Sequence, residues 1–208
     1  MTTYEAEPAI AAEIFGDRVE LARQFTADLA REGETRGLIG PLELPRLWTR
    51  HVINSALVAS VLRPGRVGDI GSGAGLPGLV LAIARPDVHM LLIEPMERRV
   101  DWLNEEVDAL GLDNVEVIRA RAEDVRLDQP LDQVTARAVS ALSKLLPLTA
   151  PLLRAGGEFV FMKGERVDAE IEAAQKVIRK LRLTDVRVDV LGDPAVTETT
   201  RVFRATRG

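Results

Sequence analysis

The sequence predicts an α/β fold in which helices cover a mostly parallel β-sheet. At 208 residues, with 46% hydrophobic side chains, the chain has about the size of one large α/β domain. From about residue 66 onward, short runs that are apolar, or that alternate between apolar and polar residues, are separated by segments of helical periodicity. A glycine-rich stretch, GSGAGLPG, directly follows the first apolar run, at the kind of position where such folds turn from strand to helix. Successive β–α–β units give neighbouring strands that run parallel.

The chain before residue 66 is helical in pattern and shows no strand. Apolar residues at helical spacing predict one helix over about 8–30 and a second over 44–62. The glycines and prolines of REGETRGLIGPLELP separate the two helices. We therefore expect a single domain over 1–208, with a helical N-terminal extension at 1–64 and a cofactor-binding core at 65–208.

Seven strands and four longer helices are expected in the core. The strands are predicted at 66–70, 88–93, 115–119, 133–137, 158–162, 186–191 and 201–206, and the helices at 77–84, 97–110, 140–153 and 167–181. The loop between the last two strands is too short for a crossover helix, so these strands should be antiparallel neighbours. A seven-stranded sheet with one antiparallel strand near the C-terminus is typical of the Rossmann-like class I methyltransferases, which use S-adenosylmethionine.

Composition excludes several kinds of site. Cysteine is absent, which excludes disulfides, thiolate zinc sites and a cysteine nucleophile, and we expect no metal. No apolar run approaches the roughly 20 residues that cross a bilayer, and the N-terminus does not look like a secretory signal. We therefore expect a cytoplasmic protein without membrane contact. The net charge of −5 argues against broad binding of nucleic acid but leaves a local basic surface open.

Two glycine patterns compete in the stretch after the first strand. The letters GAGLPG fit the dinucleotide pattern G-x-G-x-x-G, but they begin late for a strand that ends at Ile70. The pattern acidic-x-Gly-x-Gly-x-Gly fits without a shift, from Asp69 through Gly71, Gly73 and Gly75. We expect Asp69 to meet the ammonium of the methionine part of S-adenosylmethionine, directly or through water. The three glycine backbones would then pass close to the ligand.

The next two strand ends carry acidic residues on the same expected edge of the sheet. Glu94 ends the second strand, where its two oxygens suit the two hydroxyls of a ribose. Ala122 and Glu123 follow the third strand, where a backbone N–H or a carboxylate would meet the edge of an adenine. These positions complete the expected cofactor site.

The residues also restrict the methyl acceptor. Methylation of pyrimidine C5 needs a cysteine, which the chain lacks. The segment TARAVSAL lacks the Asn/Asp-Pro-Pro-aromatic motif of N6-adenine enzymes, and two histidines offer few bases for O-methylation. Guanine N7 carries its own lone pair, so its methylation requires only orientation and well-placed charge.

Several motifs together resemble one family. The segments RHVINSALV, DIGSGAGLPGLVLAI, RAEDV, ARAVSAL and GGEFVFMKG, in this order, are similar to the RsmG (GidB) methyltransferases over about 44–164. The resemblance implies methylation of guanine N7 in 16S ribosomal RNA with S-adenosylmethionine, and 16S ribosomal RNA or the small ribosomal subunit as partner. Two departures are Asn54, where the family often has Asp, and Ala136, where Ser is frequent. The implied cofactor-lining residues are Gly71, Leu76, Glu94, Ala122, Glu123 and Arg137.

Four residues are candidates for catalysis or substrate binding. Arg137 ends the fourth strand and would anchor either the cofactor carboxylate or an RNA phosphate. Lys163, after the fifth strand, would contact a phosphate or a base edge. Arg50 and His51 precede the first strand, and His51 is either a packing residue or a substrate-side residue. We expect a basic strip around the pocket, formed by Arg50, Arg137, Lys144, Lys163 and Arg166.

Three functional hypotheses remain open on this evidence. The first is a methyltransferase for guanine N7 of ribosomal RNA, and the second is a methyltransferase for a small molecule or a protein. The third is a nicotinamide-dependent oxidoreductase or a non-catalytic nucleotide-binding module. A monomer is the default expectation for the oligomeric state.

Overall fold

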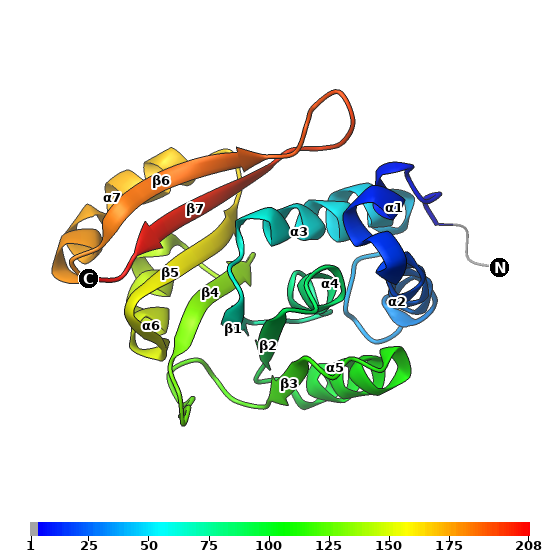
Figure 1. Cartoon of the computed structure of the whole chain (residues 1–208), viewed down its shortest axis with the longest axis horizontal. Coiled ribbons are helices and arrows are strands. Elements are labelled where there is room, and N and C mark those ends of the chain that lie inside the picture. Colours follow the sequence, from blue (N-terminus) through cyan, green and yellow to red (C-terminus); the bar gives the residue numbers. More distant parts are fainter. Residues whose placement is uncertain (1–3) are drawn as a thin grey trace.

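The computed structural model describes residues 4–208, and the first three residues of the predicted extension lie outside the described residues (Figure 1). Its centre is a seven-stranded sheet of order β3-β2-β1-β4-β5-β7-β6. The strands are β1 (Gly65–Ile70), β2 (Val88–Ile93), β3 (Val115–Ile118), β4 (Leu131–Arg137), β5 (Leu153–Lys163), β6 (Thr184–Leu191) and β7 (Thr200–Thr206). All seven predicted strands are present.

The strand directions confirm the predicted fold class. Strands β1 to β5 pair in parallel, whereas β7 lies between β5 and β6 and is antiparallel to both. Ile70 is level with Ile93 on one side and with Ala136 on the other, so β1, β2 and β4 end at the same edge. The chain order reverses between β1 and β4, and ligands of open α/β sheets bind at such a point.

The regular helices are α1 (Ile10–Phe15), α2 (Val19–Glu32), α3 (Asn54–Ala56), α4 (Gly78–Ala84), α5 (Glu97–Leu110), α6 (Leu142–Thr149) and α7 (Val167–Lys180). The prediction of one continuous helix over 8–30 was wrong. Gly16 has a φ of 51°, which ends α1, and a short 3₁₀ turn, η1 (Gly16–Arg18), leads into α2. The sequence pattern continued across this break because both helices bury their apolar residues in the same core.

The segment 44–62 is helical but not a regular α-helix, which corrects the second prediction. It consists of η2 (Leu44–Arg46), a π-helical stretch η3 (Leu47–Ile53), α3 and a 3₁₀ stretch η4 (Leu57–Val61). Wide π turns shift the side chains that follow relative to a regular helix, and they often occur at functional sites. Arg50 and His51 lie in this stretch.

The strand β5 is also longer than the prediction of 158–162. The expected helix over 140–153 ends at Thr149, a 3₁₀ turn η5 (Ala150–Leu152) follows, and β5 begins at Leu153. Its first residues include Gly156 and Gly157, which lie between the predicted helix and the predicted strand. The register between β4 and β5 is irregular at this end.

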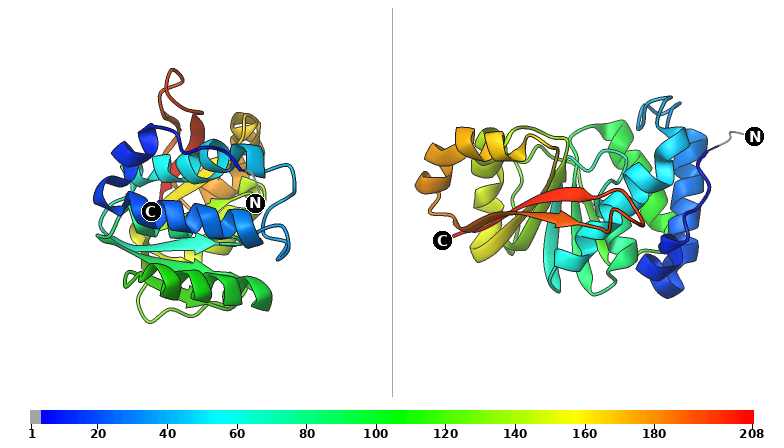
Figure 2. Two further views of the ribbon diagram at one scale, coloured as in Figure 1. Left: turned by 90° about the vertical axis from the view of Figure 1, so that its right-hand side faces the viewer. Right: turned by 90° about the horizontal axis from the view of Figure 1, so that it is seen from above.

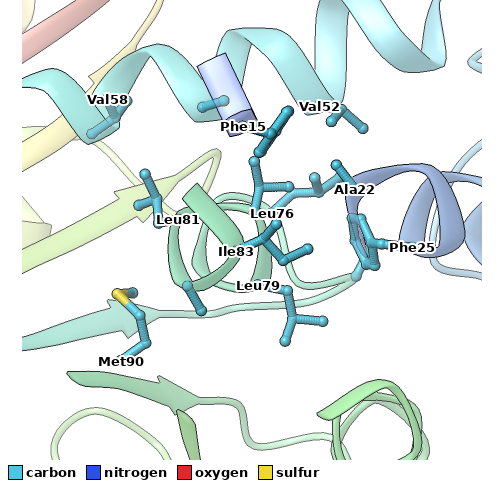
Figure 3. Packing of buried hydrophobic residues seen from close by; sticks show 14 of the residues in the cluster. Phe15, Ala22, Phe25, Val52, Val58, Leu76, Leu79, Leu81, Ile83 and Met90 are labelled. Atoms are coloured by element: carbon cyan, nitrogen blue, oxygen red, sulfur yellow. The ribbon is translucent and has the colours of Figure 1, made fainter. Parts of the chain in front are cut away.

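Two hydrophobic clusters cover the two faces of the sheet. One cluster joins α4, α5 and the N-terminal helices to one face, and the other joins α6 and α7 to the opposite face. Figure 3 shows Phe15, Phe25 and Val52 of the N-terminal region packed around Leu76 and Leu79. Figure 2 shows α1 and α2 at the end of the molecule away from α6 and α7. This shared core supports the proposal that extension and sheet form one domain.

Glu106 is a buried acid at the contact between α2 and α5, and it gives a prediction on stability. Its Oε2 has no hydrogen-bond partner among the described residues, and burial beside Asp28 and Glu32 raises its pKa to about 8. Between the ordinary value of 4.5 and 8, folding retains a proton that the unfolded chain releases, so stability falls as pH rises through this window.

The variant Glu106→Gln removes this ionisation. We expect its melting temperature to match the wild type at pH 5 and to exceed it by roughly 2–4 °C at pH 9. Differential scanning calorimetry across pH measures the difference, with Glu172→Gln, an exposed position on α7, as control. A constant difference at all pH values would contradict the ionisation of Glu106.

Candidate active site at the carboxyl edge of the sheet

The turn from β1 into α4 forms one wall of the candidate site. Gly71, Gly73 and Gly75 all have positive φ, of 70°, 58° and 90°. At Gly75 an added Cβ would lie 2.5 Å from Cδ1 of Leu79, so both backbone and space require glycine. The indole N–H of Trp102 on α5 donates to the carbonyl of Ala74 at 3.1 Å, and this hydrogen bond holds the turn against α5.

Asp69 lies beneath this turn and is fully buried. Its Oδ2 accepts a hydrogen bond from the Gly78 N–H at 3.0 Å, whereas Oδ1 has no partner among the described residues. Burial raises the pKa of this carboxyl group to about 7, although the Gly78 N–H opposes the shift. The expected contact with an ammonium therefore remains a prediction, in which Oδ1 is the free acceptor.

Glu94 ends β2 directly beside the turn. Its Oε2 accepts from the Gly73 N–H at 3.0 Å and its Oε1 from the Met96 N–H at 2.9 Å, and only 2% of the residue is exposed. Arg99 lies 3.9 Å from Oε2. The backbone therefore holds the carboxylate in one orientation at the edge of the sheet, next to the glycine turn.

The remaining predicted cofactor residues differ in placement. Ala122 is half-buried and Glu123 is exposed, both in the loop that follows β3, whose last residue, Ile118, is level with Ile93 at the end of β2. Leu76 is 7% exposed and its side chain packs in the hydrophobic core, as Figure 3 shows, and its place in the lining of the cofactor site remains a prediction. Only the backbone of Leu76 belongs to the turn.

A cleft of about 990 Å³ lies on the other side of β4. It is bounded by the ends of β4 and β5, the N-terminal part of α7, the stretch η3 and the loop before β7, which projects from the body of the molecule in Figures 1 and 2. The lining residues are Glu43, Arg50, His51, Asn54, Arg137, Ala138, Met162, Lys163, Gly164, Glu165, Arg166, Glu170, Glu198, Thr199, Thr200 and Arg201. The glycine turn and Glu94 lie outside this lining, with Arg137 and Ala138 between them and the cleft.

Arg137 stands at the boundary between the turn and the cleft. Its Nη2 donates to Nδ1 of His51, and its Nη1 donates to Oγ of Ser55 at 3.3 Å. Among residues 4–208 no carboxylate lies within ion-pair distance of this guanidinium, and burial lowers its pKa to about 10. Arg137 is therefore a charged group without a direct counter-ion in this part of the chain, which makes it a candidate for binding an anion.

His51 connects Arg137 to Glu43. Its Nε2 lies 2.6 Å from Oε2 of Glu43, and Arg46 donates to the same carboxylate from the other side. Burial and then the charge of Arg137 lower the pKa of His51, while Arg46 and then His51 lower that of Glu43 to about 2. At neutral pH the ring is therefore neutral and the carboxylate is ionised.

Lys163 is less free than the sequence suggested. Its Nζ donates to the carbonyl of Ser140 at 2.7 Å and to Oε2 of Glu170 at 2.9 Å, and its side chain is 8% exposed. Oε2 of Glu170 also accepts from the Leu142 N–H at the start of α6. Lys163 thus joins α6 and α7 to the end of β5, and at most one of its three N–H bonds is left for a ligand.

The expected basic strip is only partly present. Arg50 and Arg166 are exposed on the cleft, but Lys144 does not line it, because it lies on the exposed side of α6. Arg201 lines the cleft instead. Four glutamates lie among these cations, Glu43, Glu165, Glu170 and Glu198, so the cleft is mixed in charge rather than basic.

Sequence reasoning missed four residues of the site. Glu43 contacts His51, Ser55 accepts a hydrogen bond from Arg137, and Glu170 pairs with Lys163. The fourth is Arg201, which lines the cleft. Glu43 lies in a loop between two helical segments, and nothing in its neighbourhood in the sequence indicates a partner eight residues away. Glu170 could have been found from its place in the first turn of α7, which follows the strand that ends at Lys163.

Among residues 4–208, no group of three or more histidine, aspartate or glutamate side chains is placed to hold a metal ion. No helix in this range combines the length and the apolar character needed to cross a bilayer.

The chain is similar to several known proteins. The family described as GidB, rRNA small subunit methyltransferase G, matches residues 18–198. The chain is 68% identical to the ribosomal RNA small subunit methyltransferase G of Leifsonia xyli subsp. xyli, over 97% of both chains. It is 66% identical to the protein of the same name from Clavibacter michiganensis subsp. michiganensis, over 97% of this chain and 95% of that one. Among solved structures, M. jannaschii TYW2 in complex with AdoMet has a TM-score of 0.59 at 22% identity, over 77% of this chain and 78% of that one, which shows the fold alone.

Proposed function

Because the chain belongs to the GidB family of small-subunit ribosomal RNA methyltransferases, we propose that it transfers the methyl group of S-adenosylmethionine to N7 of a guanine in 16S ribosomal RNA. The observation that carries this proposal is the buried guanidinium of Arg137, which stands between the glycine turn and an open cleft and has no carboxylate partner within residues 4–208. One side of Arg137 suits a small cofactor, and the other side is wide enough for a nucleotide of a larger RNA.

The residues on the turn side fit S-adenosylmethionine. Oδ1 of Asp69 is a buried acceptor to which no described residue donates, which suits an ammonium. The turn carries no Cβ at Gly71, Gly73 and Gly75, so a ligand can come close to its backbone, and Glu94 offers two oriented carboxylate oxygens to a ribose. Glu123 and the backbone at Ala122 would meet the adenine. When bound, S-adenosylmethionine supplies a methyl group on a sulfonium, which a neutral ring nitrogen can attack.

The side chains of the cleft suit an acceptor that needs no deprotonation. His51 is held between Glu43 and Arg137, so neither of its nitrogens is free to remove a proton from a substrate. Arg137 remains available to orient an anion, either the cofactor carboxylate or an RNA phosphate. Methylation at N7 leaves a positive charge on the guanine ring, and the glutamates among the cations of the cleft favour that charge.

The test of this proposal is methyl transfer from labelled S-adenosylmethionine to purified 16S ribosomal RNA and to small ribosomal subunits. Nucleoside analysis of the digested product should show 7-methylguanosine at a single position. Label in another nucleoside would refute the N7 assignment. Binding of S-adenosylmethionine without transfer to either RNA would favour a small-molecule or protein acceptor instead. The proposal includes action as a monomer and in the cytoplasm, where the substrate is found.

Lys163 supplies a second test within the same assay. We expect Lys163→Ala to leave the affinity for S-adenosylmethionine unchanged and to lower kcat/KM for RNA by roughly tenfold, which corresponds to about 1.4 kcal/mol. The loss has two sources, the missing cation and the missing contact with Glu170. Calorimetric titration with the cofactor and RNA kinetics measure the two quantities. Equal losses in both would mean that Lys163 acts on the cofactor side.

A further inference from the structure

Glu43 lies two contacts away from the guanidinium of Arg137. Glu43 comes from the loop before η2, His51 from η3 and Arg137 from the end of β4, so three separate elements meet in one line of contacts. The side chains of Glu43 and His51 are 23% and 10% exposed. The line therefore runs from the rim of the cleft to the carboxyl edge of the sheet, largely shielded from water.

The proton positions along this line follow from the donors. A guanidinium can only donate, so Nδ1 of His51, which contacts Nη2 of Arg137, must be the acceptor. In a neutral ring the proton then lies on Nε2, which faces Oε2 of Glu43 at 2.6 Å. The carboxylate of Glu43 accepts that proton's hydrogen bond, so Glu43 at Nε2 and Arg137 at Nδ1 together select one of the two neutral tautomers.

We propose that Glu43 is a positioning residue, which fixes the ring and the tautomer of His51 so that His51 holds the guanidinium of Arg137 at the cleft. For the consequence in catalysis, this inference rests on the proposed function. Glu43 itself is held by Arg46, which donates to both of its oxygens, at 3.1 Å to Oε2 and 2.8 Å to Oε1. Arg46 therefore holds Glu43, Glu43 holds His51, and His51 holds Arg137.

Loss of Glu43 would leave Arg137 poorly held. If the ring carried its proton on Nδ1, its N–H would face an N–H of the guanidinium. Both groups would then be donors, and no hydrogen bond could form between them. Arg137 would then keep only the hydroxyl of Ser55, at a long 3.3 Å. A buried cation with one weak contact samples several orientations, and a misplaced group loses rate even when it is still present.

The direct test is ¹⁵N NMR of histidine side chains in the whole protein, which contains only two histidines. Long-range ¹H–¹⁵N spectra at neutral pH distinguish the two neutral tautomers and the cation, and His89→Asn assigns the second ring. We expect His51 to carry its proton on Nε2 alone in the wild type. We expect this single-tautomer pattern to be lost in Glu43→Ala and kept in Glu43→Gln, whose amide oxygen accepts the same hydrogen bond. A proton on Nδ1 in the wild type, or an unchanged pattern in Glu43→Ala, would overturn the inference.

Methyl transfer supplies the second readout. Glu43→Ala should lower kcat/KM roughly tenfold, and Glu43→Gln should restore most of that loss. Glu34→Ala, an exposed position in the loop after α2, is the matched control and should remain at the wild-type rate. In the background of Arg137→Ala, Glu43→Ala should cost nothing further, because the two residues act through one contact. Additive losses would mean that Glu43 acts independently of Arg137.

The two readouts separate failure of the inference from failure of the proposed function. If the wild type methylates no guanine in ribosomal RNA, the proposed function fails, and the NMR spectra still decide whether Glu43 sets the tautomer of His51. If the wild type produces 7-methylguanosine while Glu43→Ala keeps both rate and tautomer, the proposed function stands and the inference falls. Thermal melts of each variant establish that the fold is intact.

Discussion

Arg137→Ala is expected to lower methyl transfer by about 100-fold or more, the size of loss seen when one well-placed hydrogen-bond donor is removed from an active site. Arg137 has no carboxylate partner among the described residues, so its charge is not needed to neutralise another side chain. Removal of a buried cation without a counter-ion relieves a desolvation cost. The melting temperature of the variant should therefore be equal to or above that of the wild type, which separates lost activity from lost structure.

Two further variants make this expectation specific. Arg137→Lys keeps the charge but not the planar pair of donors, and we expect it to recover only part of the rate. Arg154→Ala removes an arginine that pairs with Asp132, away from the cleft, and should not affect transfer. Calorimetry with S-adenosylmethionine then decides which anion Arg137 binds. A loss of cofactor affinity indicates the cofactor carboxylate, and a raised KM for RNA alone indicates a phosphate. Full activity of Arg137→Ala would contradict both.

Glu94→Gln is expected to lower the affinity for S-adenosylmethionine by roughly 10–100-fold, as the loss of a charge-assisted hydrogen bond of 1.5–3 kcal/mol implies. The carboxylate accepts from two backbone N–H groups, of Gly73 and Met96. A glutamine has only one accepting oxygen, so one of these contacts is lost and a ribose hydroxyl loses an acceptor as well. Isothermal titration with S-adenosylmethionine and with its demethylated product measures the change.

Glu97→Gln is the matched control for this prediction. Glu97 lies three residues further along, is 68% exposed at its side chain, and pairs with Arg119 on the surface. Exposed pairs of this kind contribute about 0–1 kcal/mol, so cofactor affinity should hardly change. Equal losses in both variants would show that general acidity of the region, rather than the oriented carboxylate of Glu94, determines binding.

The sequence predicted the sheet well because each strand has a strong local signal. The second strand, 88–93, and the helix over 97–110 have the predicted bounds, since apolar alternation and helical periodicity both act over short distances. The antiparallel last strand also follows from a local property, the length of one loop. The glycine turn could be predicted from a local signal as well, because a backbone with positive φ favours glycine at the positions concerned.

The missed features depend on contacts between distant segments. The π-helical stretch η3 has no sequence pattern of its own, since its wide turn results from packing against the rest of the fold. Nothing in the sequence indicates that Glu43, in a loop, contacts His51. Lys163 was expected to be free for a substrate, but its ammonium pairs with Glu170. In both cases the sequence identified the charged residue but not the group that neutralises or orients it.

The indole of Trp102 gives the protein an internal optical reporter. Trp102 is 1% exposed, donates to the carbonyl of Ala74 within the glycine turn, and lies under the guanidinium of Arg36 at 5.4 Å. The second tryptophan, Trp48, lies in η3 and borders a different hollow, with Tyr4 and Arg23. Emission from Trp102 is therefore sensitive to the conformation of the segment that would surround a bound nucleoside. In a Trp48→Phe background, occupancy of the turn can be followed in real time by fluorescence without a label.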